Sequence, residues 1–168
     1  MQNYSNIQQF LHDFVLSKKI INKSLFELEK IIYLKKKNII NQSHVFITGL
    51  PRSGTTSLLN FLFSSNEYAS LKYRNMPFVL SPNFSKLFNK KNTPKKERVH
   101  GDGIAFDINS PEALDEVFFN NDEEFVKHEL ENYIQLILLS NKKSKYLSKN
   151  NLNYKRINLI NSILPNSI

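Results

Sequence analysis

Hydrophobic and polar residues alternate at helical spacing through the first part of the chain. The spacing predicts two amphipathic helices, over residues 4–21 and 24–34, with a break near Asn22 and Lys23. Each helix has one apolar side, which we expect to pack against the rest of the protein, and the alternative is a hairpin that binds a partner. No residues here suggest chemistry, so we interpret residues 1–42 as a helical arm.

A different pattern follows this arm. Residues 45–47 form a short β-branched and aromatic run, which predicts a central strand. Gly49 and Gly54 bracket a tight turn, and a helix is expected to begin at Thr55. The apolar residues expected on the buried side of that helix are Leu58, Leu59, Leu62 and Phe63.

The middle of the chain gives weaker signals. The pattern predicts a short strand over residues 68–73 and a helix over residues 76–88 that Pro82 interrupts. The polar and basic residues 90–98 are typical of a surface loop.

The last third of the chain predicts three helices and a strand. Ser110 is expected to cap a helix beginning at Pro111, and a second helix is expected from Asp122. A short strand over residues 145–148 and a helix over residues 152–164 follow. The residues expected on the buried side of the second helix are Phe125, Val126, Leu130, Tyr133, Ile134, Ile137 and Leu138.

Strands and helices alternate along residues 43–168, which predicts an α/β fold. We expect a P-loop-type three-layer sandwich around a parallel sheet. The alternation calls for another parallel strand near Ile168, where the given sequence ends. The prediction is therefore a single domain over residues 1–168, with an arm and a core, whose sheet is C-terminally incomplete.

The turn after the central strand has the composition of an anion-binding loop. Backbone N–H groups in such a turn point inward, and the N-terminus of the next helix adds partial positive charge. The spacing is G-x-x-x-x-G, but Thr55 and Thr56 stand where a Walker loop has Lys followed by Ser or Thr. Because Arg52 supplies a cation from inside the loop instead, the turn suits one phosphate and a leaving group better than a magnesium-bound triphosphate.

Three other interpretations of the loop stay open at this point. An ordinary strand-to-helix turn could contain these residues by chance. A different P-loop enzyme, such as a small kinase, is disfavoured by the missing Walker lysine and by the absence of an evident carboxylate for magnesium. An inactive remnant could serve as an anion-binding module.

Residues 49–56, Gly-Leu-Pro-Arg-Ser-Gly-Thr-Thr, resemble the phosphosulfate loop of sulfotransferases that use 3′-phosphoadenosine-5′-phosphosulfate (PAPS). The likeness is to the bacterial and tyrosylprotein-type group, which carries Arg where cytosolic sulfotransferases carry Lys. The resemblance continues in order through residues 72–78, 97–103 and 110–114, and it covers the chain from roughly Val45 onward.

This resemblance implies an enzyme that transfers a sulfuryl group from PAPS to a hydroxyl acceptor, which we expect to be a carbohydrate or a related metabolite. Arg52 would offset negative charge on the departing phosphate, and Lys149 corresponds to a lysine that faces the transferred group. Asn75 stands where related enzymes often have an acid that deprotonates the acceptor, so His100 becomes the candidate base. The family binds the 3′-phosphate with residues that would follow residue 168. The expected cofactor-binding residues are Pro51, Arg52, Ser53, Gly54, Thr55 and Thr56.

Charge and composition narrow the choice of partner. The formal net charge is +8, and the basic residues are dispersed without a nucleic-acid reading motif, so we expect an anionic cofactor or glycan and no nucleic acid. Cysteine is absent, no apolar run is long enough to span a membrane, and no secretory signal is evident, so we expect a cytoplasmic protein. The histidines are scattered, so we expect no metal.

Overall fold

The computed structural model describes residues 19–34, 43–88, 94–97 and 105–168. The helix predicted over residues 4–21 lies almost entirely outside this part of the chain.

Helix α2 (Lys19–Tyr33) is continuous, so the prediction of a break near Asn22 is wrong. Asn22, Phe26 and Glu29 are spaced four and three residues apart, which places them on one side of the helix, and all three are buried. The helix continues because packing on this side outweighs the weak helix propensity of asparagine.

The central sheet has three parallel strands in the order β1 (Val45–Ile47), β5 (Lys145–Lys149) and β2 (Tyr68–Ala69). At the carboxyl end of the sheet, Ile47 lies opposite Lys149. This confirms the predicted α/β fold with a parallel sheet. It also confirms the predicted central strand, while β5 is one residue longer than predicted.

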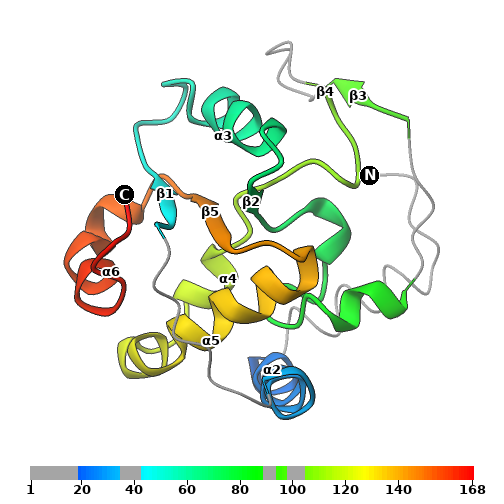
Figure 1. Cartoon of the computed structure of the whole chain (residues 1–168), viewed down its shortest axis with the longest axis vertical. Coiled ribbons are helices and arrows are strands. Elements are labelled where there is room, and N and C mark those ends of the chain that lie inside the picture. The colour runs from blue at the N-terminus through cyan, green and yellow to red at the C-terminus, as the bar shows by residue number, and fades with distance from the viewer. Residues whose placement is uncertain (1–18, 35–42, 89–93, 98–104) are drawn as a thin grey trace.

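Helices lie on both faces of the sheet (Figure 1). Helix α3 (Thr55–Ser64) packs on one face, and its buried contacts are with β1 and β5. Helices α4 (Glu116–Phe119), α5 (Glu123–Asn141) and α6 (Ile157–Ile163) lie on the other face, with α2 packed outside α5. The arrangement is the three-layer architecture that the sequence predicts.

The main hydrophobic core lies between the sheet and α5. Helix α5 follows its N-cap Asp122, as predicted, and residues 133–138 are buried in unbroken succession. A helix surrounded in this way lies between two packed elements, here the sheet and α2. The ring of Phe118 in α4 stacks on Tyr133 with the ring centroids 4.1 Å apart.

A much smaller core lies under α3. Of the residues predicted on its buried side, Leu59 is fully buried and Leu62 and Phe63 are partly buried. Leu58 is 46% exposed, so its predicted burial is wrong. Leu59 is therefore the residue of α3 that packs most deeply against the sheet.

The segment from Met76 to Phe88 does not form the broken helix predicted for it. Only η2 (Phe84–Leu87) is helical, and it is a 3₁₀ helix. The carboxylate of Glu29 accepts hydrogen bonds from Asn83 N (2.9 Å), Asn83 Nδ2 (2.7 Å) and Phe84 N (3.0 Å). These bonds from a distant helix fix the segment in a non-helical path.

Two further predictions about local structure are wrong. Strand β2 ends at Ala69 and not at residue 73, because the 3₁₀ helix η1 (Tyr73–Asn75) occupies the end of the predicted range. No helix begins at Pro111, which instead forms an isolated bridge with Lys72. Ser110 therefore caps no helix, and its hydroxyl instead donates to Asp107 Oδ1 at 3.1 Å.

The predicted loop over residues 90–98 contains a strand. Strand β3 (Lys96–Glu97) pairs antiparallel with β4 (Ala105–Phe106). Residues 89–93 and 98–104 lie outside the described residues.

The helix predicted over residues 152–164 forms as η3 (Asn153–Arg156) followed by α6. The chain then returns to the sheet, where Ile168 N donates to His44 O at 2.7 Å and Phe46 N donates to Ile168 O at 2.8 Å. This pair of bonds is one step of a parallel ladder on the outer edge of β1.

The described residues offer no candidate for a membrane-spanning helix or for a metal cluster. Among them, no helix is both long and apolar enough to cross a membrane. They also contain no group of three or more His, Cys, Asp or Glu residues that could hold a metal ion.

Candidate functional site

The loop between β1 and α3 lies at the carboxyl edge of the parallel sheet, where open α/β folds bind their ligands. Residues 50–54 are exposed, and α3 begins directly after them. Arg52 has φ 65° and Gly54 has φ 82°. Left-handed residues within a turn make a concave array of N–H groups that favours anions.

Internal contacts hold the loop closed. Ser53 N and Ser53 Oγ both donate to Leu50 O, at 3.2 and 2.7 Å. A Cβ atom on Gly49 would lie 2.8 Å from Ser53 Oγ and 2.9 Å from Thr55 Cγ2, so only glycine fits this close approach. A Cβ on Gly54 would meet nothing within 4 Å, which leaves the start of α3 open.

These features fit a phosphate group. The first N–H groups of α3 have no partner within their own helix, and the helix dipole adds partial positive charge there. The guanidinium of Arg52 is exposed and makes no hydrogen bond or ion pair with any residue that the structure describes. The loop therefore combines a backbone anion cradle with a cation that is available to a ligand.

Lys149 lies at the same edge of the sheet as the loop. It is the last residue of β5 and is paired with Ile47, two residues before Gly49. Alternation along the strand places its side chain on the same face as Leu147, which packs in the cluster containing Leu59 of α3. The structure thus brings together the loop residues and Lys149, which are separated by about a hundred positions in the sequence.

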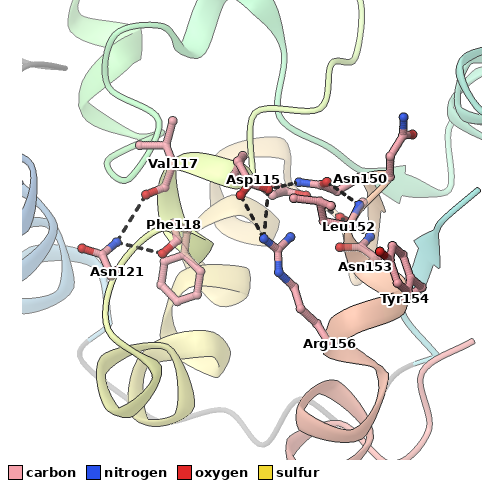
Figure 2. Close-up of polar contacts among 12 residues, drawn as sticks. Asp115, Val117, Phe118, Asn121, Asn150, Leu152, Asn153, Tyr154 and Arg156 are labelled. Atoms are coloured by element: carbon pink, nitrogen blue, oxygen red, sulfur yellow. Dashed lines mark hydrogen bonds and ion pairs between the residues drawn. The ribbon is translucent and has the colours of Figure 1, made fainter. Parts of the chain in front are cut away.

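The turn after β5 is attached to the base of the loop. Asn150 N and Asn153 Nδ2 both donate to Ile47 O at 3.1 Å, and Tyr154 N donates to Thr48 Oγ1 at 3.2 Å. Figure 2 shows Asn150, Asn153 and Tyr154 close together in this turn. The loop and Lys149 therefore share one hydrogen-bonded support.

Two acids lie behind this support, Asp115 at the N-cap of α4 and the partly buried Glu116 in its first turn. Asp115 is fully buried and accepts hydrogen bonds from the hydroxyl groups of Ser148 and of Tyr133, the latter at 3.3 Å. Burial raises the pKa of Asp115, and the hydrogen bond from Ser148 opposes the rise. Glu116 forms an ion pair with Arg156 and accepts a hydrogen bond from Asn150.

Asn75 lies apart from this cluster. The amide of Asn75 is buried, accepts from Lys72 N at 2.8 Å and donates to Ser85 Oγ at 2.9 Å. Its role is to fix the start of η1. His100 lies outside the described residues, so its position relative to the loop stays a prediction.

Sequence reasoning missed Asn150, Asn153 and Glu116. Two asparagines three residues apart directly after a predicted strand are a usable signal, because asparagine side chains bind backbone groups in turns. Asn153 also lines a cavity of about 280 Å³ beside the outer edge of β1, and its Oδ1 is buried without a hydrogen-bond partner among the described residues. No comparable signal marked Glu116, whose acidity fits a helix start equally well.

Comparisons with known proteins identify the family and a similar fold. A model of the Sulfotransferase family matches residues 44–168. A search of curated proteins finds no match. The fold is similar to the crystal structure of sulfotransferase STF1 from Mycobacterium tuberculosis, with a TM-score of 0.59 and 15% sequence identity. The match covers 98% of this chain and 54% of STF1, so the chain spans about half the length of that protein. With the family model covering most of its length, including the loop and Lys149, this chain belongs to the sulfotransferase family.

Proposed function

We propose that this chain binds PAPS through the loop at residues 49–56 and takes part in transfer of its sulfuryl group to a hydroxyl acceptor. The observation that carries the proposal is the shared position of the loop and Lys149 at the carboxyl edge of adjacent parallel strands. Family membership supports the same donor. The acceptor we propose is a carbohydrate or a related metabolite.

The loop residues divide the work of holding the 5′-phosphate. The backbone N–H groups at the start of α3 and the hydroxyls of Thr55 and Thr56 donate hydrogen bonds to its oxygens. Ser53 joins them when its hydroxyl, which donates to Leu50 O in the ligand-free loop, turns to a phosphate oxygen. Gly54 leaves room for the phosphate, since its missing side chain faces open space. Pro51 restricts the backbone as the chain enters the turn.

Two cations act on the negative charge. PAPS supplies an activated sulfuryl group whose departure leaves charge on the phosphate. Arg52 offsets that charge from inside the loop, and Lys149 offsets charge on the transferred group from the neighbouring strand. Because both cations lie at one edge, charge stabilisation needs no metal ion.

The acceptor hydroxyl must lose a proton, and the candidate base is His100. The amide of Asn75 has no useful basicity and is held by two hydrogen bonds in the protein interior. An imidazole has a pKa near neutrality and suits this task.

Calorimetric titration with adenosine 3′,5′-bisphosphate (PAP, the desulfated donor) and with ATP tests the proposal. We expect PAP to bind in the presence of EDTA and to bind more tightly than ATP with magnesium. Tighter binding of ATP, with a strict requirement for magnesium, would favour a kinase-like function instead. Absence of binding by either nucleotide would leave the chain without the donor site that we propose.

A further inference from the structure

A polar network connects helix α4 to the turn between β5 and α6. Both carboxylate oxygens of Glu116 accept from Arg156 Nη2, at 3.0 and 2.9 Å, and Oε2 also accepts from Asn150 Nδ2 at 2.6 Å. Figure 2 shows Asn150 and Arg156 extending toward α4 from the two ends of the turn. Glu116 therefore contacts the first and the last residue of this turn.

Each of these partners is fixed further by the protein. Asn150 Oδ1 accepts from Leu152 N at 2.9 Å, and Asn150 O accepts from Asn153 N at 3.0 Å. The guanidinium of Arg156 lies over the ring of Phe119, 4.3 Å from its centroid. The side chain of Arg156 is only 14% exposed, so its pairing with Glu116 is shielded from solvent more than a surface ion pair is.

The same turn supports both parts of the candidate site. Lys149 directly precedes it, and Asn153 Nδ2 donates to Ile47 O at the base of the loop. Tyr154 N donates to Thr48 Oγ1, one residue before Gly49. A shift of this turn would therefore move Lys149 and the base of the loop together.

We propose that Glu116 is a positioning residue for the phosphate loop and Lys149. It does not reach the ligand, and it acts by holding Asn150 and Arg156 at the two ends of the turn. The proposal rests on the proposed function only in treating the loop and Lys149 as the donor site.

The test is Glu116→Gln, with Glu129→Gln as the matched control. Glutamine keeps one acceptor oxygen but loses the charge that pairs with Arg156. Glu129 forms a similarly shielded ion pair with Lys30 at 2.7 Å, between α5 and α2, away from the loop. Both variants lose one ion pair, but only one of those pairs supports the turn.

Two readouts separate positioning from general stability. In the ligand-free protein, well below the unfolding temperature, Glu116→Gln should shift the amide resonances of Gly49, Gly54 and Lys149. In calorimetry, it should weaken PAP binding roughly tenfold, since small displacements of binding groups have large effects. Glu129→Gln should leave both readouts unchanged. Glu116→Asp keeps the charge and withdraws the oxygens by one methylene, so it should give an intermediate result.

Unshifted loop resonances and unchanged PAP affinity in Glu116→Gln would overturn the proposal and reduce Glu116 to a structural role. If Glu116→Gln does not fold, the Glu116→Asp resonances decide the question in the same way. If the unmodified chain does not bind PAP, the proposed function fails, whereas the resonance shifts still decide whether Glu116 positions the loop.

Discussion

The two faces of the parallel sheet are packed to very different depths. The α5 face carries the large core, with α4, α6 and α2 around a helix whose residues 133–138 are all buried. The α3 face carries a cluster whose fully shielded members are Ile47, Leu59 and Leu147. We call the α5 side the thick face and the α3 side the thin face. The loop and Lys149 lie on the thin face, whereas the hydrogen bonds of Glu116 that support them lie on the thick face.

This contrast separates stability from binding. The thick face can hold the strands at fixed spacing, because interlocked side chains there resist displacement. The thin face leaves the loop exposed and able to receive a ligand. Leu50 in the loop and Phe61 in α3 are 78% and 72% exposed, so this face also carries exposed apolar side chains.

The largest effect should come from a cavity in the thick face. Leu136→Ala removes a fully buried side chain from α5 and should lower the free energy of unfolding by about 2–5 kcal/mol. Leu59→Ala, equally buried but in the small cluster, should cost less because its exposed surroundings can close over the space. Urea unfolding measures both, and equal losses would contradict the contrast between the faces.

A second effect concerns pH at the amino end of β1. His44 is buried, and its Nδ1 accepts from Tyr146 N at 3.1 Å. Burial lowers the pKa of His44 from 6.5 to about 4. The unfolded chain therefore takes up the proton first, so stability should fall by about 3 kcal/mol as pH drops from about 6.5 to about 4.

His44→Asn tests this dependence, because an asparagine Oδ1 can accept the same hydrogen bond and does not titrate. The variant should lose most of the destabilisation between these pH values in urea unfolding. His128→Asn, on the exposed side of α5, is the control and should keep the original profile. An unchanged profile in His44→Asn would show that other groups cause the acid sensitivity.

A third effect should be confined to the thin face. Arg52→Ala should weaken PAP binding by roughly 1.5–3 kcal/mol, the usual worth of a charge-assisted hydrogen bond to phosphate. Its unfolding free energy should not fall, since Arg52 makes no described contact that holds the fold. Calorimetry and urea unfolding check the two parts, with the exposed Lys127→Ala as a charge-matched control. Unchanged affinity would count against the loop assignment.

The smallest effect concerns the outer edge of β1. An appended segment of about six alternating β-branched and polar residues after Ile168 should continue the ladder that Ile168 begins. The gain should be about 1 kcal/mol, because two new backbone bonds are offset by the ordering of the segment. A segment with proline at its second position cannot donate to Phe46 O and should give no gain. Equal melting temperatures for the two segments would exclude strand formation.

The sequence predicted best where structure depends on neighbouring residues. The run at residues 45–47, the glycines at both ends of the turn and the helix start near Asp122 are local signals, and the structure confirms the elements that they predict. The prediction of a helix after Met76 failed because the path of that segment depends on Glu29, which is about fifty residues away. Contacts of that range leave no periodic pattern in the sequence.

The candidate site divides in the same way. The loop could be predicted from the spacing of its glycines, and Lys149 from the resemblance to a family. Both lie directly beside the end of a predicted strand, so their places in the fold followed from local patterns. Glu116 was not visible, since its partners Asn150 and Arg156 are more than thirty residues away and an acid at that position suits a helix start. The family model covers the loop residues, and the roles of the loop, Lys149 and His100 stay predictions.

The left-handed backbone of Arg52 places two opposing demands on one position. A residue other than glycine or asparagine with φ near 65° carries a conformational cost of order 1–2 kcal/mol, which lowers the stability of the folded protein. Arg52→Gly would remove this cost and the cation together. A screen for thermostable variants would therefore enrich glycine here while eliminating binders, so thermal stability is a misleading guide to improvement at this position.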